Sequence, residues 1–86
     1  MQLIMISSLA CSSCIIMNNI VNDIVEKYKI DIKHIDYDFE YDSIKFDNIK
    51  MLPVFIVTKD DKEVSRLVGE KSQKEFINFL EGAKLI

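Results

Sequence analysis

The chain has 86 residues, of which 49% are hydrophobic, and a formal net charge of −3 at pH 7. This length predicts one domain over residues 1–86, and the apolar content favours a compact fold over a disordered one. The acidic balance argues against a nucleic-acid partner, because the sequence has no basic stripe to replace phosphate counterions. It also has no apolar run close to the roughly 20 residues of a membrane span, so we expect no membrane insertion.

A strand and then an amphipathic helix are predicted at the start of the chain. Residues 2–7 contain four consecutive apolar residues, which is typical of a strand covered on both faces of a sheet. From Cys14 onward the apolar positions have the spacing of one helical face, and the pattern stops near Tyr28. The positions on that face are Met17, Ile20, Val21, Ile24, Val25 and Tyr28.

The middle of the chain predicts a second strand over residues 30–37. A short helix is then expected over residues 41–46, with Ile44 and Phe46 facing inward. Because strand–helix–strand connections form right-handed crossovers, the first two strands should be parallel.

The C-terminal half predicts a hairpin followed by a helix. A third strand over residues 51–57 has Pro53 at its beginning, where a missing N–H is tolerated. A polar turn leads to a fourth strand over residues 63–68, and imperfect alternation there indicates a bulge. Ser72 and Glu75 have the spacing of a capping box. The helical stripe that follows is Phe76, Phe79, Leu80 and Ala83. The predicted class is α/β, in the order β-α-β-(α)-β-β-α, with a mixed sheet and helices on both faces.

Both cysteines of the chain, Cys11 and Cys14, lie between the first strand and the first helix with C-x-x-C spacing. The first N–H groups of a helix are unpaired and its dipole favours negative charge there, so a thiolate is stabilised at this place. The thiolate is the nucleophile of disulfide exchange. A strand leading into C-x-x-C at a helix start is therefore typical of a redox site.

The N-terminal ten residues have no basic segment before their short apolar run, which argues against a secretory signal. Leu9-Ala10-Cys11 matches a lipoprotein cleavage site only faintly. We therefore expect a cytoplasmic protein, in which a lone cysteine pair is more often catalytic or metal-binding than a structural disulfide.

From Leu3 to about Leu85 the sequence resembles the thioredoxin-fold family, in a small form of glutaredoxin size. The resemblance rests on the C-x-x-C, on Pro53 at the start of the third strand, on the hairpin, and on Gly69 before the last helix. It implies a thioredoxin-like fold and a thiol–disulfide oxidoreductase that takes part in electron transport and cell redox homeostasis. Whether the chain is closer to thioredoxins or to glutaredoxins is left open.

The resemblance also implies roles for individual residues. Cys11 is the implied nucleophile and Cys14 the resolving cysteine. Pro53 is the implied cis-proline, and the backbone of Leu52 would pair with an extended substrate. Further candidates for the site are Ala10, Ser12, Ser13 and Gly69. No bound cofactor is implied. Electrons would come from a thioredoxin reductase that uses NADPH, or from glutathione. The substrates would be protein disulfides, and the protein would be a monomer.

A soft-metal site is the alternative for the same motif. Ala10-Cys11-Ser12-Ser13-Cys14 also resembles the metal loop of copper-chaperone domains, and two thiolates suit Cu(I). Those domains end in a strand, whereas this chain is predicted to end in a helix. The single histidine, His34, lies on the predicted second strand, far in sequence from the cysteines, and we expect it at a surface or partly buried position of that strand. One histidine does not complete the four ligands of a structural zinc site.

Overall fold

The computed structural model describes residues 1–40, 46 and 49–86. Four strands form one sheet in the order β2-β1-β3-β4. The strands are β1 (Gln2–Ser7), β2 (Ile32–Asp36), β3 (Val54–Lys59) and β4 (Lys62–Val68), and the helices are α1 (Ser12–Tyr28) and α2 (Gln73–Gly82). β1 pairs with β2 in parallel and with β3 antiparallel, and β4 is antiparallel to β3. The predicted crossover, hairpin and mixed sheet are confirmed.

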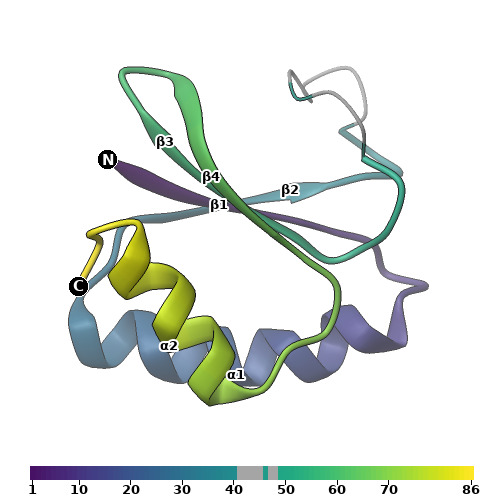
Figure 1. Cartoon of the computed structure of the whole chain (residues 1–86). Helices are drawn as coiled ribbons and strands as arrows, with labels where there is room; N and C mark the ends of the chain where they lie inside the picture. The colour runs from purple at the N-terminus through teal and green to yellow at the C-terminus, as the bar shows by residue number, and fades with distance from the viewer. Residues whose placement is uncertain (41–45, 47–48) are drawn as a thin grey trace.

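Both described helices pack on the same face of the sheet (Figure 1). β1 is buried on both faces of the sheet, because its apolar side chains alternate between two clusters. Leu3 and Met5 join the cluster beneath the helices, whereas Ile4 and Ile6 join a second cluster on the other face. The first cluster is completed by Met17, Val21, Ile24, Phe55, Val57, Phe76 and Leu80.

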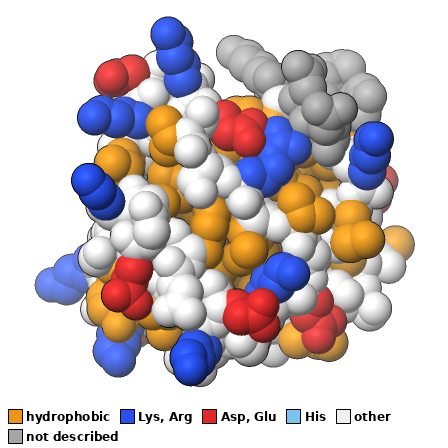
Figure 2. Space-filling view, viewed as in Figure 1, with side chains coloured by type: hydrophobic (Ala, Val, Ile, Leu, Met, Phe, Trp, Pro, Cys, Tyr) orange, Lys and Arg blue, Asp and Glu red, His pale blue; other side chains and the backbone are white. Residues whose placement is uncertain are grey.

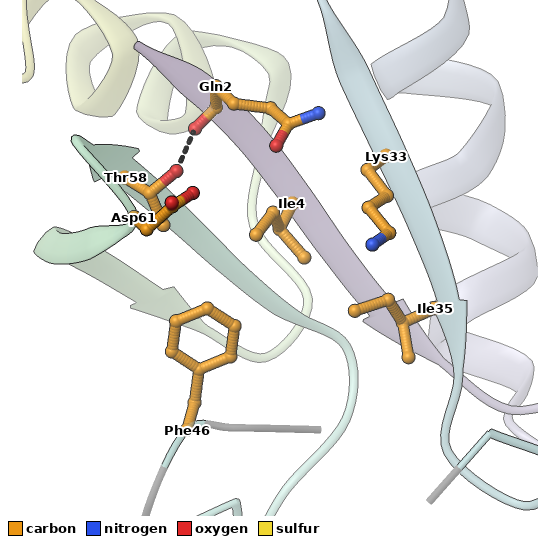
Figure 3. Close-up of a pocket in the computed structure, with 7 residues that line it drawn as sticks. All are labelled: Gln2, Ile4, Lys33, Ile35, Phe46, Thr58 and Asp61. Carbon is orange, nitrogen blue, oxygen red and sulfur yellow. Dashed lines mark hydrogen bonds between the residues drawn. The ribbon is translucent and has the colours of Figure 1, made fainter. Parts of the chain in front are cut away.

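The second face of the sheet carries a smaller apolar cluster and a hollow beside it. Phe46 packs against the cluster, as predicted, and it also lines the hollow together with Lys33 and Ile35 (Figure 3). The helix predicted over residues 41–46 lies outside the described residues apart from Phe46. A helix on this second face therefore stays a prediction.

Three strands have bounds that differ from the sequence prediction. The second strand covers only Ile32–Asp36 of the predicted residues 30–37, because Lys29 adopts a left-handed conformation that ends α1 and the chain needs two more residues to enter the sheet. β3 begins at Val54, so Pro53 precedes the strand instead of opening it, and β3 continues to Lys59, two residues beyond the predicted end. β4 begins one residue early, at Lys62, because Lys62 pairs with Lys59 across a two-residue turn of positive φ.

Two local predictions, a bulge and a helix cap, are confirmed. The ladder between β3 and β4 has a register shift between Val57 and Thr58, which is the expected bulge. Ser72 and Glu75 form the capping box of α2. None of the described helices is long and apolar enough to span a membrane. On the face seen in Figure 2, acidic and basic side chains are interspersed with apolar ones.

Candidate active site

The two cysteines occupy defined positions in the first turn of α1. Cys11 is the N-cap residue, with extended backbone dihedrals, and its Sγ accepts the N–H of Cys14 at 3.2 Å. An N-cap side chain normally supplies an oxygen to this otherwise unpaired donor. Here the acceptor is sulfur, so the helix start stabilises negative charge on Cys11 Sγ in particular.

The environments of the two thiols differ. Cys11 is partly exposed, whereas the Cys14 side chain is only 4% exposed. Burial and the hydrogen bond with Cys11 raise the pKa of the Cys14 thiol to about 11. At neutral pH Cys14 is therefore held as a thiol, and Cys11 is the accessible sulfur that receives a hydrogen bond.

The loop before β3 lies against the dithiol. The Leu52–Pro53 peptide bond is cis, and the Cys11 thiol donates to the Leu52 carbonyl oxygen over 3.7 Å. Gly69 lies on the other side of this loop and its N–H donates to the Pro53 carbonyl at 2.8 Å. The structure thus brings together Cys11, Cys14, Leu52, Pro53 and Gly69, which are far apart in the sequence.

Exposed apolar side chains flank this cluster. Leu9 is 76% exposed and Met51 is 61% exposed, and Ala10 is also exposed, whereas Leu52 is half-buried because its side chain packs on the second core cluster. The apolar rim of the cluster therefore consists mainly of Leu9, Ala10 and Met51. Ser12 is exposed and Ser13 is half-buried.

The structure places one residue near the dithiol that sequence reasoning assigned to a remote surface. His34 is exposed on β2, as expected, but it lines the same hollow as Cys14. Sequence distance concealed this, because the two positions are 20 residues apart and are joined only by the parallel pairing of β1 and β2. Among the described residues there is no group of three or more His, Cys, Asp or Glu side chains arranged to hold a metal ion.

A family model described as thioredoxin matches residues 1–82 of the chain. The chain belongs to the thioredoxin family. Thioredoxins are thiol–disulfide oxidoreductases that work with protein disulfides and with reductases, so the expected class of activity is confirmed at that level. The individual roles of the cysteines, Leu52, Pro53 and Gly69 stay predictions.

Solved thioredoxins share this fold. Thioredoxin 1 from the thermophilic eubacterium Thermosipho africanus matches with a TM-score of 0.82 and 24% identity, over 98% of this chain and 94% of that chain. Thioredoxin NaTrxh from Nicotiana alata matches with a TM-score of 0.80 and 28% identity, over 94% of this chain and 72% of that chain. Thioredoxin f2, solved in complex with ferredoxin:thioredoxin reductase, matches with a TM-score of 0.80 and 20% identity, over 95% of this chain and 76% of that chain. The comparison with curated proteins finds no match.

Proposed function

We propose that this protein reduces protein disulfides through the Cys11–Cys14 dithiol. The observation that carries the proposal is the difference between the two sulfurs. Cys11 Sγ is partly exposed and accepts the Cys14 N–H, whereas Cys14 is buried and held as a thiol. Cys11 Sγ is therefore the sulfur that can attack the substrate first, and Cys14 remains a thiol until the second exchange.

The reaction has two exchange steps. The Cys11 thiolate attacks one sulfur of a substrate disulfide, which forms a mixed disulfide and releases the first substrate thiolate. The Cys14 thiol then loses its proton and attacks Cys11 Sγ. The bond between Cys11 and the substrate breaks, the second substrate thiolate leaves, and the Cys11–Cys14 disulfide forms. The substrate gains two electrons and the dithiol loses them.

The loop of Leu52 and Pro53 is the proposed docking place for the substrate backbone. Its contact with Cys11 Sγ puts a peptide carbonyl 3.7 Å from the attacking sulfur. An extended substrate segment that pairs with this loop would carry its disulfide to Cys11 by the strand-addition mode of recognition. The exposed side chains of Leu9 and Met51 supply apolar contact on either side.

Insulin reduction by dithiothreitol tests the proposal. The wild-type protein should accelerate the precipitation of reduced insulin, and Cys11→Ser should not, because a hydroxyl does not exchange with a disulfide. Asn22→Ala is the control, since it changes an exposed residue of the same helix away from the cysteines and keeps both sulfurs. An equal rate with and without the wild-type protein would contradict general disulfide reduction.

The electron donor is a second part of the proposal. We propose a flavoprotein thioredoxin reductase that uses NADPH, because the matching family model is that of thioredoxin, with glutathione as the alternative donor. The two are distinguished by following NADPH consumption with thioredoxin reductase, or with glutathione and glutathione reductase, while insulin is the acceptor. The copper alternative uses the same two sulfurs, and the structure adds no observation that favours it.

A further inference from the structure

A hollow with a mixed polar and apolar lining lies behind Cys14, on the helix-covered side of the sheet. It has a volume of about 280 Å³, and its lining includes Cys14, His34, Asp36, Ser8 and Asn18. Since a water molecule occupies about 30 Å³ in the liquid, the hollow has room for several waters with polar partners. The buried thiol is therefore next to a space in which a proton can move to a titratable side chain.

Two features of the fold place His34 at this hollow. Parallel pairing sets His34 opposite Met5, and Met5 points to the cluster beneath the helices. Because side chains alternate along a strand, His34 lies on the face that α1 covers and Lys33 lies on the opposite face. Figure 3 shows Lys33 at the hollow of that opposite face.

The loops at the rim of the hollow are tied to each other. The Ser8 hydroxyl donates to Asp38 Oδ2 at 2.6 Å, and the Tyr37 N–H donates to the Ser7 carbonyl at 2.7 Å. The loop that leads to the cysteines is thus fixed to the end of β2. This connection ties the loop before Cys14 to β2, the strand that carries His34.

Cys14 needs a proton acceptor when it resolves a mixed disulfide. Its pKa of about 11 leaves roughly one thiolate in ten thousand at pH 7, and the thiolate is the attacking species. The other titratable groups that line the hollow are His34 and Asp36, and the Asp38 carboxylate lies at the rim. Asp36 Oδ1 already accepts the N–H groups of Asp38 and Phe39, each at 2.9 Å. An imidazole is also a better match to neutral pH than a carboxylate is, because efficient general bases titrate near the working pH.

We propose that His34 accepts the proton of Cys14 in the resolving step, directly or through a water in the shared hollow. The inference rests on the proposed function and deepens it. The proton of the Cys14 thiol passes to a neutral imidazole nitrogen as Cys14 Sγ bonds to Cys11 Sγ and the Cys11–substrate bond breaks. The leaving substrate thiolate takes up a proton from the imidazolium or from solvent, which restores the neutral imidazole.

A stopped-flow experiment separates the two exchange steps. The reduced protein is mixed with an excess of a nitrobenzoate disulfide whose thiolate product is coloured. The first phase of colour reports the attack by Cys11 and depends on the reagent concentration. The second phase reports the attack by Cys14 on Cys11 Sγ and is independent of that concentration. His34→Gln is compared with Lys33→Gln, the same replacement on the next residue and the opposite face.

The expected result is a second phase slowed by about 10²-fold in His34→Gln at pH 7, the lower end of general-base effects, with an unchanged first phase. Lys33→Gln should leave both phases unchanged. In His34→Gln the second-phase rate should rise about tenfold per pH unit between pH 7 and 9, in proportion to the Cys14 thiolate. The wild-type rate should depend less steeply on pH in the same range, because attack assisted by a base does not need preformed thiolate.

Three results would overturn the proposal. They are an unchanged second phase in His34→Gln, an equal slowing of both phases, and a wild-type second phase that itself rises about tenfold per pH unit between pH 7 and 9, as the Cys14 thiolate alone would give. The last measurement needs no variant, so misfolding of His34→Gln does not protect the idea. A second phase that is slowed and rises about tenfold per pH unit in Asp36→Asn but not in His34→Gln would assign the proton to Asp36. Failure of the insulin assay with an intact second phase would instead refute the proposed substrate class alone.

Discussion

The two glycines of the chain should respond to alanine with opposite signs. Gly69 has φ of +88°, and a Cβ built there would lie 3.4 Å from Met51 Sδ, an ordinary contact with a flexible side chain. The added methyl group therefore fits, and the destabilisation should come from the positive φ that alanine would have to adopt. Residues other than glycine in such sparsely populated regions cost about 1–3 kcal/mol, so Gly69→Ala should lower the free energy of unfolding by that amount.

Gly82 is the control within the same chain. It is the last residue of α2, and a Cβ there would meet nothing within 4 Å. Alanine in a helix is favoured over glycine by up to about 1 kcal/mol, so Gly82→Ala should raise the free energy of unfolding by a few tenths to about 1 kcal/mol.

Urea unfolding at neutral pH, with the cysteines kept reduced and the helices followed by circular dichroism, measures both changes. The expected midpoints are in the order Gly69→Ala, wild type, Gly82→Ala. If Gly69→Ala were as stable as the wild type, the positive φ would carry no cost and the reasoning would be wrong. A loss of the same size in both variants would also refute it, because the loss would then come from the added methyl group itself.

Three further outcomes are expected. Cys14→Ser should retain the substrate on Cys11 as a mixed disulfide, seen as added mass that a reductant removes; its absence would contradict the resolving role. Iodoacetamide at pH 8 should modify Cys11 and leave Cys14 unmodified until the pH approaches its pKa of about 11, as peptide mass spectrometry would report. Phe76→Ala should lower the free energy of unfolding in urea by about 3–5 kcal/mol, because its fully buried ring lies 4.9 Å from that of Phe55, whereas the half-buried Phe79 should cost less when changed to alanine.

Sequence periodicity was sufficient for the elements with one clear pattern. The run of four apolar residues in β1 predicts cover on both faces, and the structure sends Leu3 and Ile4 to different clusters. The stripe of α2 and its cap were equally readable, since Ser72 and Glu75 act within one turn. The predicted start of the third strand was wrong, because the sequence around a proline is the same whether the proline lies within the first residues of a strand or just before it.

The candidate site was predictable only where its parts are local or carried by a family pattern. The C-x-x-C is visible in the sequence because both cysteines lie in one helical turn. The approach of Leu52 to Cys11 joins residues 41 positions apart, and the resemblance to a known fold, not any local pattern, indicated it. His34 had neither signal. Its place beside Cys14 depends on the register Met5↔His34, which alternation alone does not determine.

The two helix starts of this chain use one geometry for different purposes. Ser72 Oγ accepts the N–H of Glu75 at 3.2 Å, and Cys11 Sγ accepts the N–H of Cys14 at 3.2 Å. In both cases an N-cap side chain binds the donor three residues later, so the C-x-x-C spacing is also the spacing of a helix cap. The cap orients Cys11 Sγ and makes it the favoured anion, and the same turn carries Cys14 into the core. Serine is a good N-cap residue as well, so Cys11→Ser keeps the helix start while it removes the sulfur. A loss of insulin reduction in that variant would therefore report the chemistry of Cys11 and not the folding of α1.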